Sequence, residues 1–202
     1  MQRSIAMNLL QRQILTRKNK YKIFDHHHKI IKSPPCDVFI NHRGTDTKRT
    51  VASLLYDHLY QLKLCPFLDN KNMKPGDKLF EKIDAAITGC KIGVAVFSPR
   101  YCESYFCLHE LALMMELKKK MIPIFCDVKP SELRVVDDGS MRREEVERFN
   151  LALEEAKYTV GLAFDSQKGN WSDVVRNISD IVIESLEEVD QEDYEAKKML
   201  YQ

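Results

Sequence analysis

The residue of this sequence best suited to chemistry is Glu110, which follows the segment Cys107-Leu108-His109 and precedes Leu111. The neighbouring leucines predict that its carboxyl is partly shielded from water, which disfavours the charged form. A helix expected to begin near Leu108 would instead favour the charged form, because helix N-termini attract negative charge. From residue types alone, a first-turn glutamate that merely complements the helix dipole is the simpler explanation.

A second set of reactive side chains, Cys102, Cys107 and His109, lies just before that glutamate. Their spacing matches no common zinc pattern, and three ligands are fewer than a structural zinc site needs. A nucleophilic pair of Cys107 and His109 lacks an acid in the sequence that would orient the imidazole. The run His26-His27-His28 also has no cysteine or carboxylate partner at ligand spacing. We therefore expect no metal site, and cysteines in core or wall positions.

Motifs that bind or transfer phosphate are missing. A dinucleotide fingerprint needs three spaced glycines after the first strand, and only Gly44 is found there. The segment Gly76-Asp77-Lys78 lacks the preceding glycine of a Walker A loop. A phosphorelay receiver needs an aspartate at the end of its third strand, where Ser98 stands instead. The sequence therefore argues against these three classes of protein.

Short apolar segments alternate along the chain with amphipathic ones. The apolar runs predict strands at 36–40, 66–69, 91–97, 121–126 and 159–164. Apolar residues spaced by three and four predict helices at 46–63, 79–89, 108–120, 142–158 and 171–189. This alternation predicts an α/β fold in which a five-stranded parallel sheet carries helices on both faces. Ligands bind at the carboxyl ends of such strands, so the loops after Ile40, Asp69 and Phe97 are expected to form the site.

Charge divides the chain into three parts, although all 202 residues together carry a net charge of only +1. Residues 1–35 contain eight Lys or Arg against one acid, a net of +7, which leaves −6 on the remainder. The stretch from Glu184 to Glu195 holds seven acids. We expect a basic, disordered extension over 1–35, a folded domain over 36–188 and a charged tail over 189–202. An organelle transit segment is the alternative for the extension, although it has only two serines.

The sequence has features typical of an intracellular protein. No run approaches about 20 apolar residues, so no membrane insertion is expected. The six cysteines lie in hydrophobic segments with no secretory signal before them, which predicts reduced thiols in the core. We expect a cytoplasmic protein, with the nucleus and organelle import left open.

Several segments together resemble the plant type of TIR (Toll/interleukin-1 receptor) domain. Residues 37–49 are similar to its opening motif DVFLSFRGEDTR, and residues 67–77 resemble its second strand and the following loop. Residues 96–101 and 107–111 resemble the motif VFSxxYxxSxWCLxEL, and residues 122–131 resemble PIFYDVDPS. The similarity spans about 36–186 in consistent order. No nucleotide-binding switch or leucine-rich repeat follows, so the chain looks like a TIR-only protein of the kind found in grasses.

The resemblance implies a flavodoxin-like domain that cleaves NAD⁺ at the nicotinamide–ribose bond, in plant immune and cell-death signalling. The products would be nicotinamide and either ADP-ribose or a variant cyclic ADP-ribose. The catalytic glutamate of the family maps onto Glu110. NAD⁺ is then the substrate and no cofactor is expected, while NADP⁺ is left open as a second substrate.

The resemblance also implies substrate contacts from the opening motif, the second loop and the segment before the glutamate. These residues are His42, Arg43, Gly44, Thr45, Asp46, Thr47, Gly76, Ser98, Phe106 and Cys107. Arg43 is expected near phosphate or ribose, and a salt bridge that braces the loop is its alternative. The chain departs from the plant pattern where Phe106 replaces a tryptophan, His42 a phenylalanine and Leu54 a histidine.

The expected partner besides NAD⁺ is a second copy of the chain, through TIR–TIR contacts. The competing function is an adaptor without catalysis that signals by such contacts alone. An adaptor has no need of a carboxylate at Glu110, which favours the enzyme. Nucleic acid is disfavoured as a partner because the folded part carries a net charge of −6.

Overall fold

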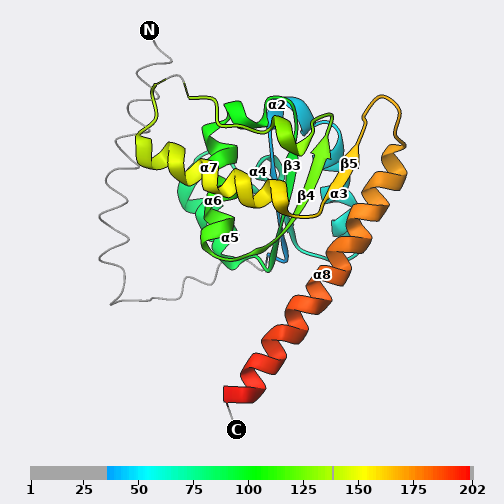
Figure 1. Cartoon of the computed structure of the whole chain (residues 1–202). Helices are drawn as coiled ribbons and strands as arrows, with labels where there is room; N and C mark the ends of the chain where they lie inside the picture. The colour runs from blue at the N-terminus through cyan, green and yellow to red at the C-terminus, as the bar shows by residue number, and fades with distance from the viewer. Residues whose placement is uncertain (1–35, 138, 201–202) are drawn as a thin grey trace. The chain divides into compact units, whose positions relative to one another are not determined.

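The computed structural model describes residues 36–137 and 139–200, and its centre is a five-stranded sheet (Figure 1). The strands are β1 (Val38–His42), β2 (Pro66–Phe67), β3 (Ile92–Phe97), β4 (Lys120–Cys126) and β5 (Leu162–Phe164). They lie in the order β2-β1-β3-β4-β5, and every neighbouring pair is parallel. The predicted five-stranded parallel sheet is therefore confirmed.

Helices cover both faces of the sheet, as predicted. One face packs against α5 (Leu79–Gly89), α6 (Tyr105–Glu116) and α7 (Arg143–Tyr158), and the other against α3 (Val51–Gln61) and α8 (Trp171–Leu200). Successive strand side chains point to opposite faces, so each strand supplies both cores. Phe39, Phe97 and Phe125 face the first group of helices, and Ile40, Val96 and Ile124 face the second.

The first predicted helix, at 46–63, is divided in two. A short helix α2 (Gly44–Thr47) ends before α3 begins at Val51. The Thr47 hydroxyl donates to the Arg43 carbonyl and also contacts His42, while Asp46 is bonded to residues that follow β3. Because these side chains are held by the sheet edge, the first turn cannot continue into α3 along one axis.

Several other boundaries differ from prediction. The polar loop after β2 contains a helical turn, α4 (Asp69–Asn72). Helix α6 begins at Tyr105 rather than Leu108, because the Ser104 hydroxyl caps it by accepting a hydrogen bond from the Cys107 backbone. It ends at Glu116, well before the predicted Lys120. Two short 3₁₀ turns, Tyr101–Glu103 and Pro130–Glu132, complete the elements.

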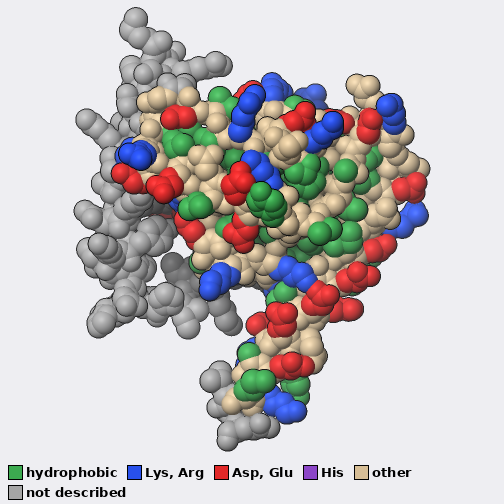
Figure 2. All heavy atoms as spheres, viewed as in Figure 1, with side chains coloured by type: hydrophobic (Ala, Val, Ile, Leu, Met, Phe, Trp, Pro, Cys, Tyr) green, Lys and Arg blue, Asp and Glu red, His purple; other side chains and the backbone are tan. Residues whose placement is uncertain are grey.

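Helix α8 runs to Leu200, beyond the predicted end at Val189, so the charged tail of 189–200 is helical in the structure. Figure 2 shows acidic side chains along the part of α8 that extends past the sheet. The predicted extension at 1–35 lies outside the described residues. Of the described helices, none has the length and apolar character needed to cross a bilayer.

All six cysteines are free thiols. Five are buried, which confirms their predicted place in the core, whereas Cys65 is exposed and the prediction is wrong there. Cys65 directly precedes β2, the short strand at the edge of the sheet.

Strand order reverses at β1, which lies between β2 and β3. In parallel α/β sheets, a crevice forms outside the carboxyl ends of the strands at such a point. The chain places Asn41 and His42 at the end of β1, and Asp69 follows β2. The fold therefore provides a ligand crevice where the sequence predicted one.

Candidate active site

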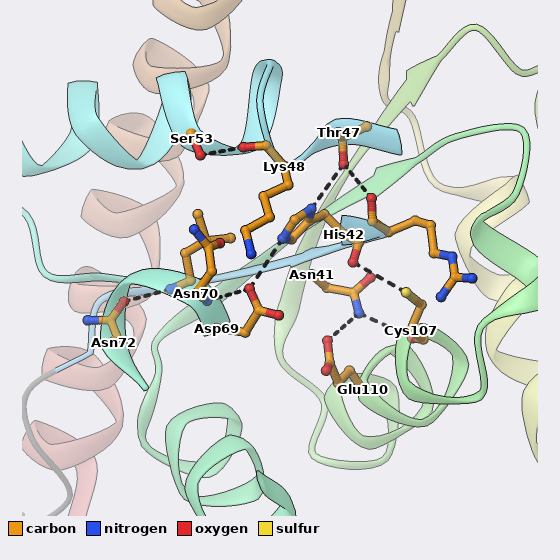
Figure 3. Close-up of polar contacts among 12 residues, drawn as sticks. Asn41, His42, Thr47, Lys48, Ser53, Asp69, Asn70, Asn72, Cys107 and Glu110 are labelled. Atoms are coloured by element: carbon orange, nitrogen blue, oxygen red, sulfur yellow. Dashed lines mark hydrogen bonds and ion pairs between the residues drawn. The ribbon is translucent and has the colours of Figure 1, made fainter. Parts of the chain in front are cut away.

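A cavity of about 180 Å³ lies at this crevice. It is lined from the sheet edge by Phe39, Ile40, His42, Arg43, Gly44 and Asp69, and from the helical side by Leu79, Ile83, Ser104, Phe106, Cys107 and Glu110. Figure 3 shows His42, Asp69, Cys107 and Glu110 gathered around one space. Five of the predicted substrate-binding residues line this cavity together with the predicted catalytic Glu110: His42, Arg43, Gly44, Phe106 and Cys107.

Glu110 lies in the second turn of α6, and the residue is 9% exposed. Burial raises its pKa from the ordinary 4.5 to about 8, and the negative charges of Asp69 and Asp84 act in the same direction. A hydrogen bond from Asn41 Nδ2 to Glu110 Oε2, 2.8 Å long, opposes this effect. The prediction that a helix N-terminus favours the ionised form is wrong, because α6 begins five residues earlier and desolvation dominates.

A buried polar network continues from Glu110 into the core. Asn41 Nδ2 also donates to the Cys107 carbonyl at 3.1 Å, and the Tyr101 hydroxyl donates to Asn41 Oδ1. Burial raises the pKa of Tyr101 well above its ordinary value, so the phenol remains neutral. The network contains no solvent-exposed member.

His42 has a hydrogen-bond partner at Nδ1, whereas its buried Nε2 has none within the described residues and lies beside Asp69. Its Nδ1 lies 3.0 Å from the Thr47 hydroxyl, which itself donates to the Arg43 carbonyl. With its hydrogen used there, that hydroxyl accepts from Nδ1–H. Nε2 lies 3.5 Å from Asp69 Oδ1 and can donate to it only when the ring is protonated. The pKa of Asp69 lies below its ordinary 3.8, chiefly because of this contact with His42.

Arg43 brings positive charge to the cavity. Its Nε atom is buried and has no hydrogen-bond partner among the described residues. The alternative of a salt bridge that braces the loop is not found within 36–137 and 139–200. A buried, unpaired guanidinium donor at a cavity wall is suited to an anionic ligand.

Phe106 and Cys107 form the helical wall of the cavity. The Phe106 ring packs against Phe80 with 5.4 Å between ring centroids, which supplies an aromatic wall without an indole donor. The Cys107 thiol donates to the His42 carbonyl at 3.3 Å, and burial raises its pKa to about 12. Cys107 is therefore a wall residue, as predicted, and unsuited to be a nucleophile.

His109 contacts residues other than Cys107. Its Nε2 lies 3.3 Å from Asp84 and its Nδ1 lies 3.2 Å from Arg148. Both nitrogens are therefore occupied away from Cys107, which removes the alternative of a Cys107–His109 pair. In the part of the chain that the structure describes, no three His, Cys, Asp or Glu side chains converge as a metal site would require.

The other predicted substrate contacts lie outside the cavity wall. Asp46 accepts hydrogen bonds from Ser98 at 2.8 Å, from Thr45 and from the Arg100 guanidinium. Burial opposes ionisation of Asp46, but these hydrogen bonds outweigh it and hold its pKa below 3.8. Asp46, Ser98 and Thr45 thus clamp the loop after β1 to the loop after β3, and Thr47 orients His42.

Gly76 is likewise not among the residues that line the cavity. It adopts a φ of +96°, a left-handed conformation that glycine accepts readily, in the turn after α4. Its role as a substrate contact stays a prediction.

Sequence reasoning missed two polar residues of the site, Asn41 and Asp69. Both stand at the carboxyl end of a strand, which is the signal that could have identified them. Asn41 pairs with Tyr101 and Glu110, and Asp69 pairs with His42. These partners are far apart in the sequence, so no local spacing identifies the pairs.

An open parallel sheet with a buried carboxyl at its switch point defines an α/β domain that binds a small ligand at the sheet edge. The chain belongs to the TIR domain family, whose sequence profile matches residues 36–200.

Three relatives give the family context. The chain is 50% identical over 158 residues to the probable 2' cyclic ADP-D-ribose synthase BdTIR of Brachypodium distachyon, covering 76% of this chain and 70% of that protein. It is 31% identical over 166 residues to TMV resistance protein N of Nicotiana glutinosa, covering 74% of this chain but only 14% of that protein. The TIR domains in the structure of the activated Roq1 resistosome match with a TM-score of 0.63 and 28% identity, over 73% of this chain and 99% of that one.

Proposed function

We propose that this protein cleaves NAD⁺ at the nicotinamide–ribose bond, releasing nicotinamide together with ADP-ribose or a cyclic ADP-ribose. The observation that carries the proposal is the buried Glu110 in the wall of a cavity that Arg43 also lines. Identity of 50% to a protein named as a probable 2' cyclic ADP-D-ribose synthase supports it. Similarity to a plant resistance protein supports a place in immune signalling.

The reaction needs little more than one well-placed carboxylate. The bond between the ribose C1 and the nicotinamide nitrogen breaks, and its electron pair leaves with neutral nicotinamide, so no leaving-group acid is required. The remaining ribose carries an oxocarbenium-like positive charge, which the Glu110 carboxylate stabilises in a site of low polarity. Attack by water and loss of its proton give ADP-ribose, whereas attack by a hydroxyl of the same molecule gives a cyclic product.

Residues around Glu110 fit the rest of the substrate. The Arg43 guanidinium is the positive group for the diphosphate, and Phe106 offers an apolar ring in the same cavity for the flat nicotinamide. The positive nicotinamide ring of bound NAD⁺ favours the ionised form of Glu110, which burial disfavours in the free protein. NAD⁺ is the substrate in this scheme, and no cofactor takes part.

Self-association forms part of the proposal. A groove of about 510 Å³ between α3 and α8 is lined by Leu54, Asp57, His58, Gln61, Trp171, Ser172, Val175 and Arg176. Leu54 is 45% exposed there, an apolar side chain suited to a second copy of the domain. The loop around Gly76, which does not reach the cavity of its own subunit, would then complete the site of a neighbour.

Nicotinamide release from NAD⁺ tests the proposal, measured chromatographically with the full chain and with Glu110→Gln. Loss of a transition-state charge partner typically costs about 10²–10³ in rate. Glu116→Gln, an exposed change at the end of the same helix, is the matched control and should retain activity. If folded Glu110→Gln and the wild type release nicotinamide equally fast, the proposal is refuted. Self-association without any turnover would favour the adaptor.

A further inference from the structure

Asn41 is the most completely enclosed polar side chain next to the proposed catalytic group. Its exposure is 0%, and it is not among the residues that line the cavity. Both ends of its amide are occupied: Nδ2 donates to Glu110 and to the Cys107 carbonyl, and Oδ1 accepts from Tyr101. It can therefore act on the substrate only through its neighbours.

The direction of this amide follows from its partners. The Cys107 backbone carbonyl is an acceptor only, so the group 3.1 Å from it must be the NH₂. The Tyr101 hydroxyl then donates to the amide oxygen at the other end. A reversed amide would place two oxygens against each other at Cys107, so the NH₂ is held toward Glu110 whether or not that carboxyl is charged.

We propose that Asn41, anchored by Tyr101, is a positioning residue that fixes the orientation of the Glu110 carboxyl in the cavity and favours its charged form. The effect on rate rests on the proposed NAD⁺ cleavage, whereas the effect on Glu110 itself does not. The hydrogen bond from Asn41 is the only one that reaches the Glu110 carboxyl within the described residues.

The other groups that act on Glu110 oppose this effect or are neutral. Asp69, after β2, and Asp84, on α5, both disfavour a second negative charge. Cys107, on α6, and Tyr101 are uncharged because burial raises their pKa values. The positive Arg43 lies close enough to act on Cys107, and His42 contacts Asp69 rather than Glu110. Asn41 is thus the direct local support for the charged carboxylate.

Asn41→Asp keeps the size of the side chain but removes the NH₂ donor and adds a carboxyl beside Glu110, so the inference is tested by this variant together with Tyr101→Phe, which adds no charge. Asn72→Asp, on α4, is the control that adds the same charge elsewhere (Figure 3). Asn72 Oδ1 accepts a hydrogen bond from the Leu68 backbone, and an aspartate can accept the same bond. The readout is the titration of Glu110 by carbon NMR of glutamate-labelled full-length protein, with the resonance assigned by its loss in Glu110→Gln.

We expect Asn41→Asp to raise the midpoint of the Glu110 titration by at least about one pH unit, because it removes a hydrogen bond to a charged group and adds a carboxyl beside that group. Asn72→Asp should leave the midpoint near that of the wild type. The pH at which kcat rises should move with the NMR midpoint while KM changes little, because Asn41 does not line the cavity. An unchanged midpoint, or an equal shift in both variants, overturns the inference.

Tyr101→Phe adds no charge, so it separates the loss of the anchored hydrogen bond from the effect of the new carboxyl, and it also decides the question if Asn41→Asp does not fold. Without the hydroxyl the amide oxygen loses its partner and only the Cys107 carbonyl still orients the amide, so the midpoint should rise in the same direction by a smaller amount. A folded Tyr101→Phe with the wild-type midpoint contradicts the anchoring role. If the wild type cleaves no NAD⁺, the proposed function fails, but the NMR titration still decides whether Asn41 supports the charged carboxylate.

Discussion

Burial of Glu110 should make the protein less stable as the pH rises, and Glu110→Gln should remove that effect. The folded-state pKa of about 8 lies above the ordinary 4.5, so the folded form holds more protons than the unfolded form between these values. The contribution of Glu110 to the unfolding free energy is therefore fully present below about pH 4.5 and is lost as the pH rises toward 8. Glutamine stays neutral at every pH, and its oxygen can still accept from Asn41.

The size of the effect follows from the two pKa values. A difference of one pKa unit is worth about 1.4 kcal/mol, so the rise from 4.5 to about 8 corresponds to roughly 5 kcal/mol at high pH. Part of this loss is already present at pH 5, and the last part appears only above pH 8. Between pH 5 and pH 8.5, Glu110→Gln should gain roughly 4 kcal/mol in unfolding free energy relative to the wild type.

Urea unfolding of both proteins at pH 5 and pH 8.5 measures this gain. Comparing the variant with the wild type at each pH removes the contributions of the other titrating groups. Glu116→Gln, an exposed change on the same helix, is the control. A stability difference between Glu110→Gln and wild type that is the same at both pH values, or changes by less than about 1 kcal/mol, would refute the reasoning that desolvation governs this carboxyl.

Three further outcomes are expected. Gly161→Ala should lower the unfolding free energy by about 1–3 kcal/mol, because the added Cβ would lie 2.3 Å from the Pro123 carbonyl oxygen. An unchanged urea midpoint would contradict this and show that β4 and β5 can move apart at this position. Asp46→Asn should loosen the loop clamp to Arg100 and raise KM for NAD⁺ roughly tenfold with little effect on global stability, and identical kinetics would contradict the clamp. NAD⁺ turnover should increase more steeply than protein concentration, and strict proportionality down to a concentration where light scattering detects only monomer would contradict an assembled site.

Much of the fold could be predicted from local pattern. Apolar runs that alternate with amphipathic segments predict the five parallel strands, and this alternation also predicts that the loops after β1 and β2 meet at one edge. The single predicted helix at 46–63 was wrong because tertiary hydrogen bonds of Asp46 and Thr47 to the sheet edge end α2 early. The helix propensities of residues 46–63 give no information about these hydrogen-bond partners.

The site was less accessible to sequence reasoning. Resemblance identified Glu110 and the residues beside it, but the balance between burial and the helix dipole depends on where α6 begins. Asn41 is a polar residue in a buried strand, and its function depends on Tyr101 and Glu110, which lie 60 and 69 positions further along. Such long-range pairing emerges only when the strands and helices are assembled.

Mass spectrometry of the products formed when the purified full chain is incubated with NAD⁺ tests the central claim most directly. The account predicts nicotinamide in equal amount to NAD⁺ lost, together with ADP-ribose or a species lighter by one water, and neither product from Glu110→Gln. Intact NAD⁺ after incubation with self-associated wild-type protein would contradict the claim that this cavity is a catalytic site.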